Sequence, residues 1–274
     1  TAMCLILLGW RAHPAWKLIA AANRDEYYER PSEPIHWWTD CPGLLAGRDL
    51  RGGGAWMGVT RAGRFAAVTN FRDPASVRSD APSRGELVPD FLASGKTAEA
   101  WMEELAKRAS IYNGFNLLTS DGDELWYFGN RKGEDPERLG PGIYGLSNRF
   151  LDTPWPKVER SRAGFSAAIS GGTPESEALF RVLADRRRPP DEELPDTGVG
   201  LEFERILSPP FIVGPVYGTR SSSVLRMGED GTGEFWERSF APENGDVRIT
   251  ETRRIEIVGD SAKNPTWAQG DSQQ

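Results

Sequence analysis

The order of strand-like and helix-like segments along the 274 residues is the strongest constraint on the fold. Short apolar runs separated by glycine-containing turns make up the first third, the middle and the last third of the chain, as β-strands do. Two segments of helical periodicity separate the first two groups of strands, and two more precede the last group. This order does not match a parallel doubly wound sheet. It favours mainly antiparallel sheets covered by helices.

The expected elements follow from these patterns. Strands are predicted at 4–9, 17–23, 43–47, 55–60, 64–71, 115–119, 124–129, 143–148, 216–227, 233–239 and 252–258. Helices are predicted near 87–92, 98–108, 155–169 and 175–186. Ser83 and Glu86 have the spacing of a capping box, and Thr97 is a candidate N-cap. We expect an exposed loop at 187–200, one domain over 1–259 and a disordered tail over 260–274.

Composition excludes several classes of function. The net charge of −7 argues against a nucleic-acid-binding protein, because phosphate contacts need a basic face. No apolar run approaches the roughly 18 residues that cross a bilayer. The apolar start of the chain has neither a basic region nor an Ala-x-Ala site, which argues against a signal peptide. Two cysteines cannot form a disulfide framework, so we expect a reducing compartment and a cytoplasmic location.

Cys4 is the first candidate for a catalytic group. If Met3 is the natural initiator and is removed, Cys4 becomes the first residue. Its α-amine, with a pKa of about 7.7–8.0, can then take the thiol proton directly or through a water. No histidine is needed, which suits a chain whose only histidines are His13 and His36. The alternative is a buried apolar cysteine on an edge strand.

A polar cluster follows the second predicted strand. If that strand pairs with the first, the run Asn23-Arg24-Asp25-Glu26 lies near Cys4. The charge of Arg24 would lower the pKa of the thiol, and Asp25 would accept hydrogen bonds from the α-ammonium group. The alternative is that the charged residues simply begin a surface loop.

Three further residues are candidates because of their chemistry. Asn70 and Asn148 stand at the ends of strands, and a side-chain amide is a neutral donor suited to an oxyanion hole. Arg220 would add a cation. The alternatives are turn asparagines and a solvated arginine.

Other familiar patterns fail. The run Arg51-Gly52-Gly53-Gly54 lacks the Gly-Lys-Ser/Thr ending of a phosphate loop. No G-x-S-x-G elbow is present. The cysteines and histidines match no zinc-ligand spacing, so we expect no metal.

Motifs spread over residues 3 to about 240 carry a family resemblance. The chain resembles the NRDE family of transport and Golgi organization protein 2 homologues, named for Asn23-Arg24-Asp25-Glu26. The matching segments include Met3-Cys4-Leu5-Ile6, Arg30-Pro31, Gly54-Ala55-Trp56-Met57-Gly58, Thr69-Asn70, Arg84-Gly85-Glu86-Leu87-Val88, Tyr112-Asn113-Gly114-Phe115-Asn116-Leu117, Tyr144-Gly145-Leu146-Ser147-Asn148, Thr153-Pro154-Trp155, Tyr217-Gly218-Thr219-Arg220 and Glu237-Arg238-Ser239. The resemblance implies links to haem mobilisation and to lipid or acyl-CoA homeostasis.

More distantly, the chain is similar to the choloylglycine hydrolase and penicillin V acylase group. That likeness implies an αββα sandwich of the N-terminal-nucleophile hydrolase type. It also implies a site with Cys4 as nucleophile and, around it, Arg24, Asp25, Asn70, Asn148 and Arg220. The chain departs from the acylases because two residues separate their arginine from their aspartate, whereas Arg24 and Asp25 are adjacent.

Three functions stay open from the sequence. The first is a cysteine amidohydrolase or acyltransferase that acts on a small amide. The second is a binding or trafficking protein for haem or an acyl chain on the same scaffold, without a resident cofactor. The third is a purely structural or interaction role in the cytoplasm. Thr1 and Ala2 are expected to be additions in front of Met3. A chain that retains them is expected to be inactive in amide hydrolysis, because Cys4 then has an amide in place of an amine.

Overall fold

Two antiparallel sheets face each other in the computed structural model, which describes residues 3–172 and 174–259. Within these residues, one sheet runs in the order β10 (Gly142–Leu146), β1 (Met3–Trp10), β2 (Leu18–Tyr27), β11 (Tyr217–Met227), β12 (Gly233–Glu243) and β13 (Asp246–Ile257). The other runs in the order β3 (Ser32–Trp37), β4 (Leu44–Asp49), β5 (Met57–Thr60), β6 (Phe65–Asn70), β7 (Phe115–Ser120), β8 (Leu125–Gly129) and β9 (Glu137–Leu139).

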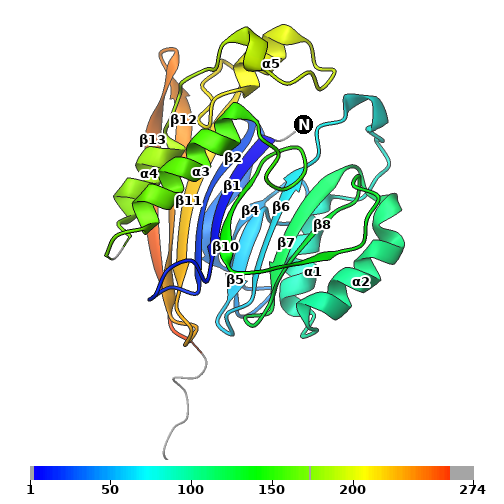
Figure 1. Cartoon of the computed structure of the whole chain (residues 1–274), viewed down its shortest axis with the longest axis vertical. Helices are drawn as coiled ribbons and strands as arrows, with labels where there is room; N and C mark the ends of the chain where they lie inside the picture. Colours follow the sequence, from blue (N-terminus) through cyan, green and yellow to red (C-terminus); the bar gives the residue numbers. More distant parts are fainter. Residues whose placement is uncertain (1–2, 173, 260–274) are drawn as a thin grey trace, which may run out of the picture.

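Helices cover the outer face of each sheet (Figure 1). The β3–β9 sheet carries α1 (Leu87–Ala93) and α2 (Ala98–Arg108), and the other sheet carries α3 (Pro156–Ile169) and α4 (Ser176–Leu183). A short helix, α5 (Leu201–Leu207), lies beyond one end of the sheets (Figure 1). The predicted four-layer αββα sandwich is confirmed. Among the residues described, no helix combines the length and apolarity that a bilayer crossing requires.

The alternation of side chains along β1 explains the layering. Ile6 and Leu8 pack between the sheets, whereas Leu5 and Leu7 pack against α3 and α4. Both faces of this strand are therefore buried, which is why its sequence is a continuous apolar run. Cys4 belongs to the same series as Ile6 and Leu8, so it lies on the face that looks toward the second sheet.

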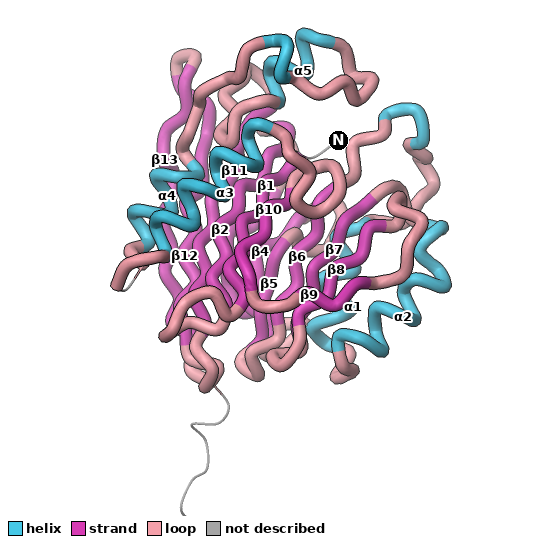
Figure 2. The backbone as a smooth tube through the Cα atoms, viewed as in Figure 1, coloured by secondary structure: helices cyan, strands magenta, loops and turns pink. Residues whose placement is uncertain are grey.

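Most of the predicted elements are confirmed, and the exceptions have physical reasons (Figure 2). β3, β9 and α5 were not predicted. β3 contains Pro34 and lies at a sheet edge, where proline is tolerated. β9 has only three residues, and α5 has seven. The C-terminal stretch predicted as a tail, 260–274, lies outside the described residues.

One of the two predicted caps is wrong. The backbone N–H of Ala100 donates to Thr97 Oγ1 at 3.3 Å, which confirms Thr97 as the N-cap of α2. The Ser83 side chain makes no capping hydrogen bond, and a 3-10 turn follows it. Glu86 instead accepts a hydrogen bond from the Tyr112 hydroxyl at 2.6 Å, so a tertiary contact takes the carboxylate that the capping box would have used.

Candidate active site

Cys4 and Arg24 lie side by side on the inner face of their sheet. The antiparallel pairing of β1 and β2 sets Cys4 directly opposite Arg24 and Met3 opposite Asp25. Residues opposite each other in such a pair point to the same face of the sheet. The predicted pairing of the first two strands is therefore confirmed, and it brings Arg24 to Cys4.

A pocket of about 710 Å³ opens at this end of β1, and Cys4, Arg24 and Asn70 line it. Cys4 is only 6% exposed. The rest of the lining is strongly basic: the arginines are Arg24, Arg30, Arg51, Arg78 and Arg84, and the carboxylates are Glu26 and Asp49. The candidate nucleophile thus faces a cationic pocket.

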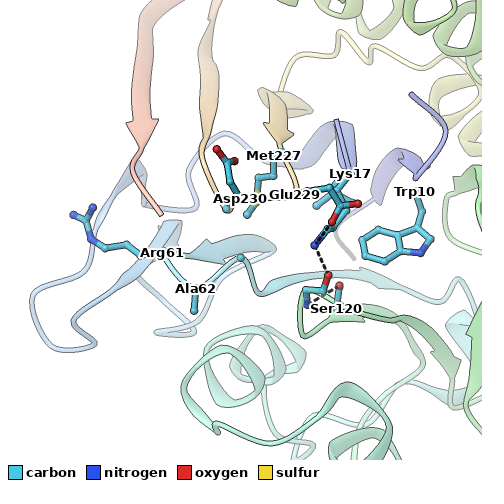
Figure 3. Close-up of a pocket in the computed structure, with 13 residues that line it drawn as sticks. Trp10, Lys17, Arg61, Ala62, Ser120, Met227, Glu229 and Asp230 are labelled. Atoms are coloured by element: carbon cyan, nitrogen blue, oxygen red, sulfur yellow. Dashed lines mark hydrogen bonds and ion pairs between the residues drawn. The ribbon is translucent and has the colours of Figure 1, made fainter. Parts of the chain in front are cut away.

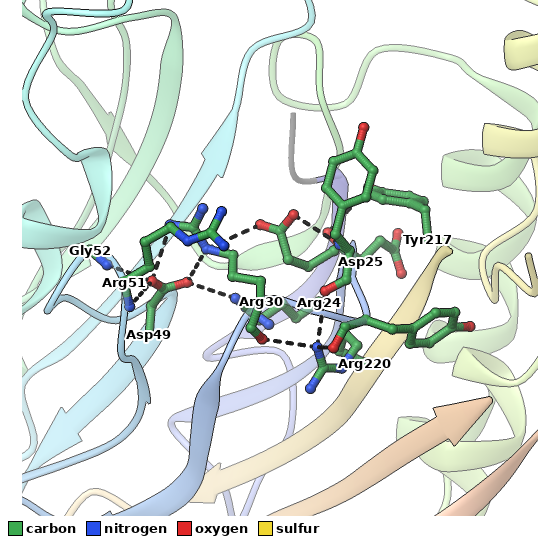
Figure 4. Close-up of polar contacts among 11 residues, drawn as sticks. Arg24, Asp25, Arg30, Asp49, Arg51, Gly52, Tyr217 and Arg220 are labelled. Atoms are coloured by element: carbon green, nitrogen blue, oxygen red, sulfur yellow. Dashed lines mark hydrogen bonds and ion pairs between the residues drawn. The ribbon is translucent and has the colours of Figure 1, made fainter. Parts of the chain in front are cut away.

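Asp49 organises one wall of this pocket (Figure 4). Its Oδ2 accepts hydrogen bonds from Arg24 Nη2 at 2.8 Å and from Arg30 Nε at 2.6 Å, and its Oδ1 accepts one from Gly52 N at 2.7 Å. Burial opposes ionisation of this carboxyl, but the hydrogen bonds and the arginine charges outweigh it and lower the pKa of Asp49. Asp49 is therefore ionised, and it holds two guanidinium groups in place.

The thiol of Cys4 is protonated at neutral pH while residues precede it. Burial is the largest effect and, with the charge of Asp25, raises the pKa of Cys4 to about 12. The charge of Arg24 and a hydrogen bond from the Asp25 backbone N–H lower it by less. The predicted influence of Arg24 on the thiol pKa therefore has the right sign, but the effect of burial is larger.

Asp25 lies on the opposite face of β2 from Arg24. Its Oδ1 accepts a hydrogen bond from the Thr219 hydroxyl at 2.7 Å, and the buried Lys157 of α3 is a charged neighbour. Burial raises the pKa of Asp25 and lowers that of Lys157, while attraction between the two charges opposes both shifts. Adjacent residues on a strand cannot share a face. Arg24 and Asp25 therefore point to different layers of the sandwich.

The two asparagines have different positions. Asn70 lines the pocket. Asn148 is fully buried and does not line it, and its Nδ2 donates to the Asn70 carbonyl at 2.8 Å. The neighbouring Ser147 hydroxyl donates to the Cys4 carbonyl at 3.0 Å. Asn148 therefore positions Asn70, and the structure does not bring its amide to the pocket as an oxyanion donor.

Arg220 acts on a loop beside the site. A β-bulge sets it out of register between Thr219 and Ser221. Its Nη1 donates to the carbonyls of Tyr27, Tyr28 and Arg30 at 3.0, 2.7 and 3.0 Å (Figure 4). It does not line the pocket of Cys4. Arg220 therefore fixes the turn that carries Arg30, which is an indirect role in the predicted cluster.

Arg220 lines a smaller adjoining cavity of about 310 Å³ that contains the buried Glu237. Burial raises the pKa of Glu237 to about 7, although the Ile35 N–H and the Ser223 hydroxyl donate to its carboxylate. Trp56 lines both this cavity and the pocket of Cys4.

Sequence reasoning missed several residues of the site. Arg30, Trp56, Arg84 and Glu237 fall inside the segments that carry the family resemblance, but nothing in their spacing assigns them a place. Asp49 has no motif around it. Only the folded chain shows that it joins two arginines.

The last glycine of the run at 52–54 is required for a close contact between two backbone segments. A Cβ on Gly54 would lie 2.3 Å from the carbonyl of Gly85, so only glycine allows the two backbones to meet. The Ala55 N–H donates to that carbonyl at 3.0 Å. This contact fixes the turn that carries Arg84 against the loop that follows Asp49.

The histidines do not reach the pocket. His13 Nε2 pairs with the Gly172 carbonyl at 2.8 Å, and His36 Nδ1 pairs with the Pro34 carbonyl at 2.9 Å. Neither lines the cavity around Cys4. Within the described residues, no group of three or more His, Cys, Asp or Glu side chains has the arrangement of a metal site.

A separate pocket of about 480 Å³ lies at the far end of β1, beside Trp10 (Figure 3). Lys17 there forms an ion pair with Glu229 at 2.7 Å and donates to the Gly122 carbonyl at 2.8 Å. None of the predicted site residues lines it.

An apolar groove of about 670 Å³ adjoins the pocket of Cys4. Exposed apolar side chains line it: Val77, Phe203, Ile206 and Val216. Tyr27 lines both the groove and the pocket. The candidate site therefore has a basic part at Cys4 and an apolar part beside α5.

The chain is similar to several known proteins along most of its length. The bovine Transport and Golgi organization protein 2 homolog is 37% identical over 259 residues, covering 87% of this chain and 93% of the relative. The human homolog is 34% identical over 277 residues, covering 93% and 99%. A crystal structure of a mutant conjugated bile acid hydrolase from Clostridium perfringens is similar with a TM-score of 0.49 and 10% identity, over 94% of this chain and 92% of that one.

The sequence model of one family spans most of the chain. It is the model of Transport and Golgi organisation 2, and it matches residues 3–242. The resemblance to the NRDE family predicted this match. The chain belongs to the Transport and Golgi organisation 2 family.

Proposed function

We propose that this protein is an N-terminal-nucleophile cysteine amidohydrolase or acyltransferase that acts on a small amide or acyl substrate once the residues before Cys4 are removed. One observation carries the proposal. Cys4, at the start of β1, faces a large basic pocket in which no histidine stands to activate it. A free α-amine is the base that such a cysteine needs.

The register of the strands supports this use of the amine. Met3 lies opposite Asp25, so the backbone nitrogen of Cys4 is next to the Arg24–Asp25 segment of β2. Asp25 can accept a hydrogen bond from an α-ammonium group formed there. Asp25 would therefore bind the α-ammonium group from the helix-facing side of β2. Arg24 and Asn70 line the pocket and would contact the substrate.

The reaction balances without a cofactor. The α-amine takes the thiol proton, and Sγ attacks the amide carbon while the carbonyl electrons move onto oxygen. The C–N bond then breaks, the α-ammonium returns the proton to the leaving nitrogen, and a thioester remains. Water adds to the thioester while the amine takes its proton. Cleavage of the C–S bond releases the acid, and the thiolate recovers the proton. Asn70 and Arg24, which line the pocket together with Cys4, would donate to the developing oxyanion.

A second function has one observation in its favour. The apolar groove beside α5 suits an acyl chain, so a binding or trafficking protein for acyl lipids is the alternative on the same scaffold. Haem is less well supported. No histidine lines the pocket to serve as a ligand of the haem iron.

We place the reaction in the cytoplasm. Both cysteines of the chain, Cys4 and Cys41, are free, which supports a reducing compartment.

Steady-state kinetics tests the proposal. Three proteins are compared on a panel of small acyl amides: the chain from Cys4, the same chain with Thr1-Ala2-Met3 retained, and the Cys4→Ser variant of the chain from Cys4. The proposal predicts turnover by the first alone or at least about 100-fold above the others, the scale of one lost acid–base group. Equal turnover by the first two would refute the role of the α-amine.

A further inference from the structure

The pocket of Cys4 has an excess of positive charge in a protein whose net charge is −7. Five arginines and two carboxylates line it among the residues described, which leaves three positive charges uncompensated: the arginines are Arg24, Arg30, Arg51, Arg78 and Arg84. Like charges gathered in one cavity repel each other and lower stability. We therefore expect the positive electrostatic field of these arginines to serve the binding of a ligand.

The two carboxylates are already engaged. Asp49 takes hydrogen bonds from Arg24 and Arg30, and Glu26 lies 3.6 Å from Arg30. They therefore neutralise the wall of the pocket formed by β2 and the end of β4.

The three other arginines of the lining have no such partners. Within the part of the chain that the structure describes, Arg51, Arg78 and Arg84 make no ion pair with a carboxylate. Arg78 donates to the carbonyls of Ser110 and Ile111, and Arg84 donates to the carbonyl of Gly114 at 3.0 Å. Burial, together with the charge of Arg30, lowers the pKa of Arg84 to about 10, and the charge of Glu26 offsets this only in part. These carbonyls orient the guanidinium groups but leave their charges unmatched.

Arg24 is an independent sign of a missing ligand. It is 5% exposed, and its Nη1 has no hydrogen-bond partner within the described chain. Its guanidinium lies over the ring of Trp56, 4.6 Å from the ring centroid, and both residues line the pocket. An unpaired polar group that is this deeply buried is costly, so its presence points to an acceptor that the bound state supplies.

We infer that this pocket binds an anionic oxygen group, a carboxylate or a phosphate, of the substrate, and that Arg51, Arg78 and Arg84 hold it while the reacting carbonyl lies at Cys4. Guanidinium groups match such anions with paired N–H donors. The inference rests on the proposed function only for the place of the carbonyl. Recognition of the anion follows from the charges alone.

The arrangement also separates the two parts of a ligand. The uncompensated arginines are in the pocket, while the exposed apolar side chains are in the groove, and Tyr27 lines both. The anionic group of a ligand would bind to the arginines, and its hydrocarbon part would lie in the groove. A neutral ligand would leave the arginines unmatched.

Calorimetric titration of the chain Thr1–Gln274 tests the inference, because binding of the anion does not need a free α-amine on Cys4. Hippurate and hippuramide form a matched pair that differs only in a carboxylate and its neutral amide. We expect hippurate to bind at least about tenfold more tightly than hippuramide, and added salt to remove the difference. Phenyl phosphate is the third ligand: tighter binding than hippurate assigns the site to phosphates, and weaker binding assigns it to carboxylates. Equal affinity for hippurate and hippuramide would overturn the inference.

Two variants locate the anion. Arg51→Gln removes an exposed charge of the pocket, and Arg138→Gln removes an exposed charge on β9 as the matched control. We expect Arg51→Gln to weaken hippurate binding by about threefold to tenfold and to leave hippuramide unchanged, as the loss of one charged contact does. Arg138→Gln should change neither. Equal effects of the two variants would show only a long-range field and would contradict a site at the pocket. If amide turnover fails while this pattern holds, the proposed reaction is wrong and the anion site stands.

Discussion

At the residue scale, the Asn-Arg-Asp-Glu motif is a strand whose consecutive side chains face different layers. Arg24 and Glu26 point toward the pocket, while Asn23 and Asp25 point toward α3 and α4. Asn23 Nδ2 donates to the Leu183 carbonyl at 2.9 Å, so it ties the sheet to the end of α4. The motif therefore builds the site and anchors it to the helical layer at the same time.

The first prediction concerns the reactivity of Cys4. In the chain that retains Thr1-Ala2-Met3, burial holds the thiol pKa at about 12, so iodoacetamide at pH 8 should label the half-buried Cys41 well before Cys4. The thiolate fraction of Cys4 should be lower by about 10³ than that of an ordinary thiol. Peptide mapping by mass spectrometry after timed quenching measures the two rates. Faster labelling of Cys4 than of Cys41 would contradict the described environment.

At the element scale, α5 is held to the sandwich by buried polar contacts more than by its own sequence. Arg72 Nη1 donates to Glu204 Oε2 at 2.6 Å, and both residues are almost fully buried. Lys157 of α3 donates to the Leu207 carbonyl at 3.1 Å, at the end of the helix. Seven residues are too few for a helix that is stable alone. These contacts therefore decide whether the groove beside α5 exists.

The second prediction tests this attachment. Glu204→Gln leaves the buried guanidinium of Arg72 without its counter-charge, which should lower the free energy of unfolding by about 3–5 kcal/mol. Glu202→Gln is the control, since Glu202 lies on the same helix, is exposed and pairs with Arg205. It should change stability by less than about 1 kcal/mol. Urea unfolding followed by tryptophan fluorescence measures both, and similar effects of the two substitutions would contradict the account.

Local sequence patterns explain which elements could be predicted. Runs such as 4–9 and 64–71 are apolar, bounded by turns and long enough to be recognised as strands. β3, β9 and α5 are short, and neighbours distant in sequence stabilise them. The predicted capping box at Ser83 failed for the same reason, because Tyr112 takes the carboxylate of Glu86. Tertiary contacts override a local signal of about 1 kcal/mol.

At the scale of the whole molecule, the site lies where one end of both sheets meets the loops between them. β1 and β2 supply Cys4 and Arg24, β4 supplies Asp49, and the loop before α1 supplies Arg84. The sequence predicted that Cys4 and Arg24 are neighbours, because their two strands are consecutive in the chain and pair with each other. It could not predict Asp49 or Arg84, because only the packing of one sheet on the other brings them to Cys4.

The third prediction is a pH dependence of global stability. The pKa of Glu237 is raised from 4.5 to about 7 by burial, so the folded protein binds more protons than the unfolded chain between these values. The contribution of Glu237 to the free energy of unfolding is fully present below pH 4.5. Up to about 3 kcal/mol of it is lost as the pH rises through 7. Glu237→Gln, which mimics the protonated form, should therefore gain stability relative to the parent between pH 5 and pH 8. Urea unfolding at both pH values measures the difference. A difference between the two proteins that is independent of pH would show that Glu237 ionises freely.

The measurement that tests the central claim most directly is the intact mass of the protein after incubation with an activated acyl compound. The chain from Cys4 and its Cys4→Ala variant are mixed with the same thioester and quenched in acid, beside the chain that retains Thr1-Ala2-Met3. We predict one acyl group on the chain from Cys4 within the time of a turnover and none on the other two, because only the first has both the thiol and the α-amine. An adduct that forms equally with Thr1-Ala2-Met3 present, or that survives the loss of Cys4, would contradict the claim that Cys4 is an N-terminal nucleophile.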